Sequence, residues 1–492
     1  MRILPALLLL CITATLSAQT LRYDIAFEKA QTAGKMKLDV TLEFYPSPTG
    51  TSRFVLPEQI NWSGNLLDCY RKFDVQGGTF RREGNTVLLF TAKDQKGPVQ
   101  LHYELIQHFS GEQVTVETSC SPIILADYMH VPGECLFLVP RHYHLYDVSV
   151  HWKDLPKGWT IQNSFNSGQI EQEFKSSNTD WLRANWVAGD FRILHGEVEG
   201  KPIAFAIRGK WVFEDRTLFE VIRKTIATQR STWDDFDIPF YSVTMIPFVL
   251  PTGQRIVGRA RTGQCLGYGS FQSFIVFASD DCPLDPLINL FNHEMMHDWI
   301  GGKIDVGPAN ASTSLRWLAE GFTEYYALRN RWKAGFITTP AFLKELNDDF
   351  FAAHYADPCG EMPNLELERN YFSSETCENL PYRRGCLLAF YLDARIRKQT
   401  GNTKTLHNLM TELLDYTYGN DRTLVEHYEF LTETLGEYLG DETMAFLAQY
   451  VDAGKRIPAK AYVLPEFLSL RVTPAGVPLL AIAAGREADF KK

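Results

Sequence analysis

The sequence lacks several features that would assign it to particular classes of protein. It contains no Cys-x-x-Cys pair, which is the usual spacing of a structural zinc site, and no internal repeat or low-complexity linker. It also lacks an excess of positive charge, since its formal net charge is -10. The charge therefore gives no reason to expect nucleic acid or an anionic membrane as a partner.

No apolar run long enough to span a bilayer appears after the first 18 residues, which have the pattern of a secretory signal peptide. Arg2 precedes an apolar run from Ile3 to Ile12, and small and polar residues follow up to Ala18. The alternative is a buried first helix. We expect cleavage after Ala18, and so an exported mature chain, periplasmic or extracellular, with no integral membrane segment.

Eight cysteines follow the predicted cleavage site, an even number that permits disulfide bonds in an exported protein. The sequence does not choose among the many possible pairings. The spacings favour three pairs that would each close a modest loop: Cys120 with Cys135, Cys265 with Cys282, and Cys359 with Cys377.

The hydrophobic pattern changes along the chain, which at 492 residues is too long for one compact core. Apolar and polar residues alternate at 36–44, 86–92 and 99–106, so we expect an antiparallel β domain in the N-terminal part. Helical spacing follows at 215–236, 283–302 and 314–335, strands are expected at 241–250 and 274–279, and nearly everything after about residue 340 is expected to be helical.

The expected helix at 283–302 contains FNHEMMHDWIGG, in which His293 and His297 are four residues apart. Residues i and i+4 share one face of a helix, so both rings can offer a nitrogen to one ion, and Glu294 can reach a water bound to that ion. Imidazole and carboxylate ligands with one position open to water suit a catalytic zinc. The alternative is two surface histidines on an amphipathic helix.

The next expected helix contains WLAEGFTEYY and could supply the third ligand. Glu320 would complete a His-His-Glu set. Glu324 lies four residues on, so it shares a face with Glu320 and could accept a hydrogen bond from a ligand histidine. The alternative for each carboxylate is a place on the surface without a ligand role.

These motifs resemble those of two families of gluzincin zinc metallopeptidases. HEMMHDWIGGKI is similar to the zinc helix HExxHxWxGN of the aminopeptidase N-like family, and WLAEGFTEYY to its WLNEGFA helix. The departures are Gly302 and Ala319, where that family has Asn, and a longer gap between the motifs. The segment PYRRGCLLAFYLDARIRKQTG at 381–401 is similar to a YxKGALVALLLDLRIR block of the glycyl aminopeptidase-like family.

The resemblance implies a multidomain α+β fold with a thermolysin-like zinc catalytic domain and one Zn²⁺ per chain. The domains expected are a signal peptide at 1–18, a β domain at 19–195, the catalytic domain at 196–400 and a helical region at 401–492.

The resemblance also implies that the Tyr382 hydroxyl stabilises the oxyanion of the reaction intermediate, a task that suits a neutral donor beside a metal. The alternative is a buried core tyrosine. Arg383 and Arg384, which follow, are expected to be solvated surface charges rather than ligands of a substrate carboxylate.

One feature of both families is missing, namely a strand of the GxMEN or GGLEH type whose glutamate binds the substrate's amino group. The matching stretch here is GSFQS, from Gly269 to Ser273, so Gln272 takes the place of the glutamate and no Glu occurs between 255 and 280. Gly269 and Gln272 are therefore expected to line the substrate site, with a weaker hold on the amine.

The expected function is that of a secreted zinc-dependent peptidase, aminopeptidase-like, with a peptide or protein as substrate. Glu294 would act as general base and acid, while His293, His297 and Glu320 would hold the metal. Two alternatives stay open: a zinc endopeptidase that does not recognise the N-terminal amine, and a non-catalytic peptide-binding protein on the same fold.

Overall fold

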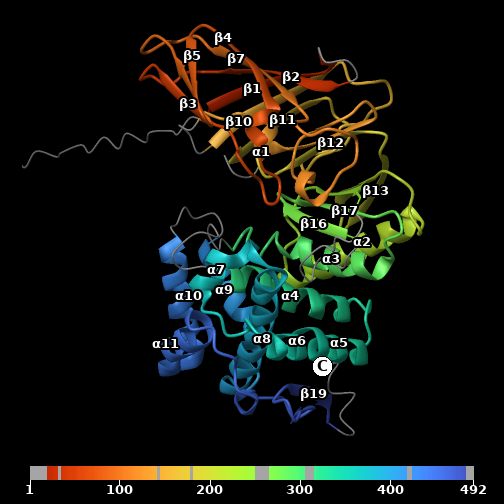
Figure 1. Ribbon diagram of the computed structural model, residues 1–492, viewed down its shortest axis with the longest axis vertical. Coiled ribbons are helices and arrows are strands. Elements are labelled where there is room, and N and C mark those ends of the chain that lie inside the picture. The colour runs from red at the N-terminus through yellow and green to blue at the C-terminus, as the bar shows by residue number, and fades with distance from the viewer. Residues whose placement is uncertain are drawn as a thin grey trace, which may run out of the picture. The chain divides into compact units, whose positions relative to one another are not determined.

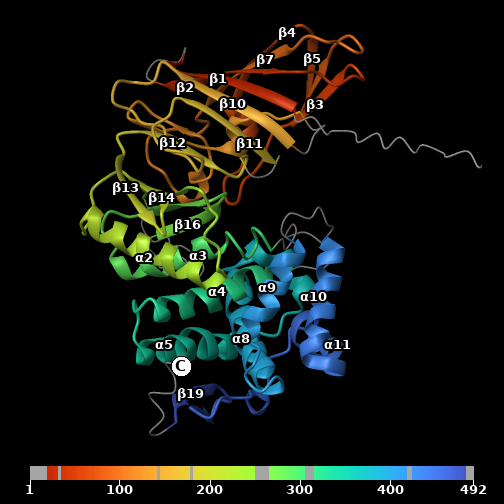
Figure 2. The same cartoon turned by 180° about the vertical axis from the view of Figure 1, so that it is seen from behind.

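The computed structural model describes residues 19–30, 35–140, 145–177, 181–249, 265–304, 315–417 and 424–483. The predicted signal peptide at 1–18 lies outside these residues. The chain forms two compact units (Figures 1 and 2). The first contains the chain up to His108 together with Ser121–Gly158 and Gln169–Arg183, and the second contains Phe109–Cys120, Trp159–Gly168 and the chain from Ala184 onward.

The first unit is built on a six-stranded sheet with the strand order β11-β10-β1-β2-β7-β4, and a three-stranded sheet with the order β3-β6-β5. The strands are β1 (Gln19–Lys29), β2 (Met36–Phe44), β3 (Thr51–Val55), β4 (Tyr70–Gln76), β5 (Thr79–Glu83), β6 (Thr86–Phe90), β7 (Val99–Ile106), β10 (Leu145–Lys153) and β11 (Glu171–Ser177). The short β8 (Ile123–Ile124) and β9 (Tyr128–Pro132) form an antiparallel pair, followed by helix α1 (Gly133–Leu136).

The predicted N-terminal β domain is confirmed, because the expected strands at 36–44, 86–92 and 99–106 correspond to β2, β6 and β7. One pair differs from the antiparallel expectation, since β1 and β10 run parallel. Alternation of apolar residues shows which face of a strand is buried but does not show the direction of a partner far away in the sequence.

The second unit contains a five-stranded mixed sheet with the order β13-β14-β15-β17-β16. Its strands are β13 (Arg192–Val198), β14 (Lys201–Ile207), β15 (Tyr241–Pro247), β16 (Cys265–Ser270) and β17 (Ser273–Ala278), and a further strand, β12, spans Asn185–Gly189. β14, β15 and β17 are parallel, whereas β16 pairs antiparallel with β17. Among the residues that the structure describes, β16 is an edge strand of this sheet. In Figures 1 and 2, α2 (Asp215–Trp233) and α3 (Leu284–Met296) lie side by side against these strands.

The rest of the second unit is mostly helical, as predicted. Its helices are α4 (Arg316–Lys333), α5 (Thr339–Glu345), the π-helix Leu346–Ala352, α6 (Ala353–Ala356), α7 (Asn364–Asn370), α8 (Glu375–Gln399), α9 (Leu406–Thr417), α10 (Leu424–Leu439), α11 (Thr443–Phe446) and the π-helix Leu447–Asp452, and a hairpin of β18 (Leu468–Val472) and β19 (Pro478–Ile482) follows. Residues from 401 onward belong to the same compact unit as the sheet, and the predicted division at position 400 stays a prediction.

Two glycines let α4 and α8 cross with their backbones in contact. A Cβ atom at Gly321 would lie 2.2 Å from the Cα of Gly385, and one at Gly385 would lie 1.9 Å from the carbonyl oxygen of Trp317. Backbone atoms cannot move aside as a flexible side chain can, so each position excludes a larger residue. Glu320 is next to Gly321 on α4, and Tyr382 lies about one turn before Gly385 on α8. The crossing therefore fixes the position of Glu320 relative to Tyr382.

Within the part of the chain that the structure describes, no helix combines the length and apolar character needed to cross a membrane.

We expect Gly385→Ala to lower the free energy of unfolding by about 1–3 kcal/mol or more, because the added methyl group overpacks the crossing of α4 and α8. Chemical denaturation of the purified protein measures this. Gly436→Ala in α10 is the matched control, since nothing lies within 4 Å of its added Cβ, and it should be neutral or stabilising. Equal stability of the two variants would contradict this account of the crossing.

Candidate active site

Helix α3 carries the two histidines, and it ends six residues earlier than the sequence indicates. It runs from Leu284 to Met296 and leaves His297 at its C-cap. His297 keeps right-handed helical backbone angles, with φ of -65° and ψ of -11°, so its side chain stays on the face of His293. The predicted extension to residue 302 is wrong, because turns at 297–299 and 301–303 and a bridge between Ile300 and Ile304 replace the rest of the expected helix.

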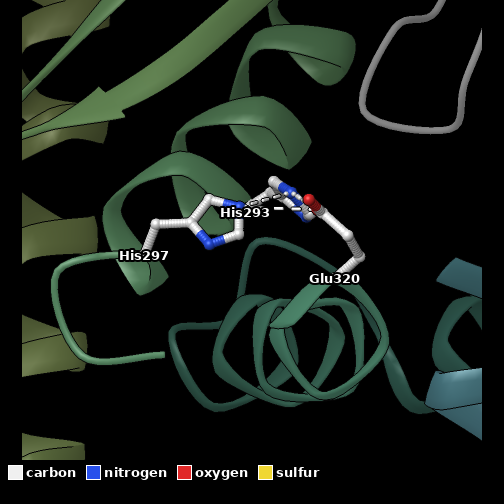
Figure 3. A group of neighbouring side chains, drawn as sticks. All are labelled: His293, His297 and Glu320. Atoms are coloured by element: carbon white, nitrogen blue, oxygen red, sulfur yellow. Dashed lines mark hydrogen bonds and ion pairs between the residues drawn. The ribbon is translucent and has the colours of Figure 1, made fainter. Parts of the chain in front are cut away.

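The structure brings the three predicted metal ligands together (Figure 3). The Nε2 atoms of His293 and His297 lie 3.1 Å apart. Glu320 reaches toward them from α4, with its Oε2 atom 3.4 Å from Nε2 of His293 and 3.6 Å from Nε2 of His297. One ligand atom from each residue lies within 4.8 Å of the others. Two imidazoles and a carboxylate converging on one point fit a zinc ion, which accepts nitrogen and oxygen ligands.

The other ring nitrogen of each histidine has a partner of its own. Oε1 of Glu324 lies 3.1 Å from Nδ1 of His293. Nδ1 of His297 lies 3.0 Å from the carbonyl oxygen of Ile300, to which it can donate its proton. An acceptor at Nδ1 favours the tautomer whose Nε2 lone pair faces the metal position.

The electrostatics of the cluster favour a cation. Burial alone would lower the pKa of His293, but hydrogen bonds to Glu320 and Glu324 outweigh it and raise that pKa to about 10. Burial likewise opposes ionisation of Glu320, and the hydrogen bonds to His293 and His297 hold its pKa well below its usual range. The site therefore stabilises positive charge between the two imidazoles, where a divalent metal would supply it.

Glu294 is buried and packs against the edge strand β16. A Cβ atom at Gly267 would lie 3.0 Å from Cγ of Glu294, and one at Gly269 would lie 3.0 Å from Cβ of His297 and from the carbonyl oxygen of Glu294. Residues two apart on a strand face the same side, so both glycines face α3. Their lack of side chains lets β16 lie directly against the helix that carries the histidines.

Gln272 lies outside the strand that contains Gly269. It occupies the turn between β16 and β17 with a φ of +47°, three residues beyond Gly269. Its carbonyl oxygen accepts a hydrogen bond from the backbone N–H of Ser242. Roles for Gly269 and Gln272 in substrate binding stay predictions. Residues 265–278, which form β16, the turn and β17, contain no acidic residue that could bind a substrate amine.

Tyr382 belongs to the same site. Its ring stacks on the ring of His293, with the centroids 5.7 Å apart and the planes at 26°. Its hydroxyl lies 3.4 Å from the hydroxyl of Tyr371, a residue that the sequence motifs did not indicate. Tyr371 follows α7 in a short 3-10 helix, Tyr371–Ser373, and it belongs to no recognisable motif.

The expectation that Arg383 and Arg384 are solvated surface charges is wrong for Arg384, which is only 3% exposed. Its guanidinium donates hydrogen bonds to the carbonyl oxygens of Gly360 and Met362, so it holds the loop before α7 against α8. Arg383 is partly exposed and pairs with Asp357 at 3.5 Å.

The structure records the eight cysteines as thiols, and the three predicted disulfides stay predictions. In two of the predicted pairs the side chains are within hydrogen-bonding reach of each other, Cys265 with Cys282 and Cys359 with Cys377.

The model of the M61 glycyl aminopeptidase family matches residues 286–362, a stretch that contains the predicted ligands His293, His297 and Glu320 but ends before Tyr382. No curated protein matches the chain.

Solved structures with similar folds include an aminopeptidase N family protein from Idiomarina loihiensis, with 16% identity, a TM-score of 0.70 and coverage of 92% of this chain and 79% of that one. An M1 zinc metallopeptidase from Deinococcus radiodurans, with a Tyr-Ser-Ala substrate bound, is similar with 13% identity, a TM-score of 0.55 and coverage of 92% and 96%. These findings confirm the gluzincin resemblance and the multidomain α+β fold.

We expect Glu324→Gln to weaken zinc binding by about 10- to 100-fold, because the neutral amide supports the ligand tautomer of His293 less strongly. Competition with a chelating dye measures the affinity. Glu412→Gln serves as the control, since Glu412 pairs with Tyr438 and Lys404 instead. Unchanged zinc affinity in Glu324→Gln would show that this contact does not support the metal site.

Proposed function

We propose that the protein is an exported zinc-dependent peptidase with aminopeptidase-like activity. The observation that carries the proposal is the convergence of His293, His297 and Glu320 on one point, beside a buried Glu294. A purely structural zinc site has four protein ligands. Three protein ligands next to a carboxylate that is not one of them are the pattern of a hydrolytic site.

Zinc, when bound, would polarise the attacking water and the scissile carbonyl and lower the pKa of the water toward neutrality. The two histidines and Glu320 would hold it. Glu324 and the carbonyl group of Ile300 keep the histidine rings oriented, so that each Nε2 atom faces the proposed metal position.

Glu294 is the proposed general base. It takes the proton of the attacking water and later delivers it to the leaving nitrogen. Tyr382 is the proposed oxyanion donor, because its ring lies against His293 and a neutral phenol can donate to the developing negative charge without bringing a charge of its own.

The peptide substrate is proposed to bind along β16 as an added strand. An edge strand offers backbone N–H and C=O groups to an extended peptide. Gly267 and Gly269 bring that strand close to Glu294 and His297, so a peptide bound along it passes near the metal ligands.

Glu294→Gln should bind zinc with the wild-type stoichiometry and lose about 10²–10⁴-fold in kcat, because the amide cannot accept the proton of water. Hydrolysis of a panel of fluorogenic peptides, with and without a chelator, and metal analysis of the same preparations measure both properties. Retained activity would refute the assignment of the base. A wild-type protein that binds zinc but cleaves no peptide would support the non-catalytic alternative.

A second experiment tests the aminopeptidase-like assignment by comparing one peptide with a free and with an acetylated N-terminus. We expect the free form to be cleaved faster, but by about tenfold at most, because the neutral Gln272 amide can offer the ammonium group only a hydrogen bond worth ~0.5–1.5 kcal/mol. Equal rates would favour an endopeptidase. A preference well above a hundredfold would mean that a carboxylate outside 265–278 binds the amine.

A further inference from the structure

A second tyrosine lies behind the proposed oxyanion donor. Tyr371 and Tyr382 are 4% and 6% exposed, and their hydroxyl oxygens lie 3.4 Å apart. A phenol has one proton to donate and lone pairs that can accept. When two buried phenols meet, one of them donates to the other, and the acceptor keeps its own proton for a third group.

Arg316 makes Tyr371 a stronger hydrogen-bond donor than an isolated phenol. Its guanidinium carbon lies 3.9 Å from the centroid of the Tyr371 ring, which is cation–π geometry. Positive charge over the ring draws electron density from the phenol, which makes the hydroxyl proton more acidic. The Tyr382 ring stacks on His293, so its own hydroxyl lies beside the proposed metal site.

Glu368 fixes Arg316 in this position. Its carboxylate receives two hydrogen bonds from the guanidinium, at 3.1 Å from Nε and 2.7 Å from Nη2. Glu368 lies three residues before Tyr371, and Arg316 lies one helical turn before the proposed ligand Glu320. Two-point pairing between planar groups restricts the guanidinium to one orientation.

We infer that Tyr371 is a positioning residue for the proposed reaction: its hydroxyl donates to the oxygen of Tyr382 and so directs the Tyr382 proton toward the oxyanion. Hydrogen bonds in a chain strengthen one another, so a phenol that accepts a bond is also the better donor. The inference rests on the proposed peptidase function and extends it to the network of Tyr371, Arg316 and Glu368.

The test is a double-mutant cycle of Tyr371→Phe and Tyr382→Phe in the zinc-loaded protein. Tyr371→Phe should lower kcat by about five- to tenfold and leave KM within twofold, because it weakens a contact made in the transition state. Tyr382→Phe should cost about 10²–10³-fold. Adding Tyr371→Phe to Tyr382→Phe should then cost less than about twofold, since the residue acts through Tyr382.

A binding measurement gives a readout that does not depend on turnover. A phosphinic peptide carries a tetrahedral anion like that of the intermediate, and calorimetry should show binding weakened by about five- to tenfold in Tyr371→Phe. Tyr438→Phe is the control, because it removes another buried hydroxyl, one that donates to Glu412. It should change neither kcat nor phosphinic peptide binding.

The outcomes separate the inference from the proposed function. Suppose that the wild type cleaves peptides and that Tyr371→Phe has the wild-type kcat, or lowers kcat by the same factor in the wild type and in Tyr382→Phe. The positioning role is then wrong, and the proposed peptidase function stands. If the wild type neither cleaves peptides nor binds the phosphinic peptide, the proposed function fails and the inference fails with it. Unfolding midpoints within a few degrees of the wild type ensure that each comparison uses folded protein.

Discussion

The site depends on a partly buried electrostatic arrangement: two imidazole nitrogens 3.1 Å apart, with the carboxylates of Glu320 and Glu324 on either side of His293. Buried carboxylates without compensating charge are costly. A positive charge between the imidazoles compensates the Glu320 carboxylate, and the hydrogen bonds to Glu320 and Glu324 raise the pKa of His293. The cluster is best understood as a site prepared for a cation.

Close backbone contacts hold this arrangement in place. Gly321 and Gly385 allow the backbones of α4 and α8 to touch, and this contact sets the position of Glu320 relative to Tyr382. Gly302 serves the turn after α3: a Cβ atom there would lie 2.5 Å from the carbonyl oxygen of His297 and 2.6 Å from that of Asp298. That turn also brings the carbonyl oxygen of Ile300 to His297. The glycine where related zinc helices have asparagine therefore has a local packing reason in this chain.

Much of the site could be predicted from the sequence, because its ligands follow helical spacing within two short motifs. The i and i+4 relation of His293 and His297 needs only the helix, and Glu320 and Glu324 follow from the same rule. Tyr371, Arg316 and Glu368 could not be found in this way, because their juxtaposition with Tyr382 depends on how the segment 364–382 folds back on α4. The parallel pairing of β1 with β10 and the burial of Arg384 have the same origin: both depend on partners distant in the sequence, which the periodicity of a single element does not describe.

In the proposed site, two imidazole nitrogens and one carboxylate hold a single zinc ion and leave a position for water. X-ray absorption spectroscopy of the zinc-loaded protein reports on these ligands. We expect a shell of nitrogen and oxygen atoms at ~2.0–2.2 Å, with the scattering pattern of two imidazoles and no sulfur. A zinc–sulfur distance of about 2.3 Å, or a shell without imidazole, would contradict it.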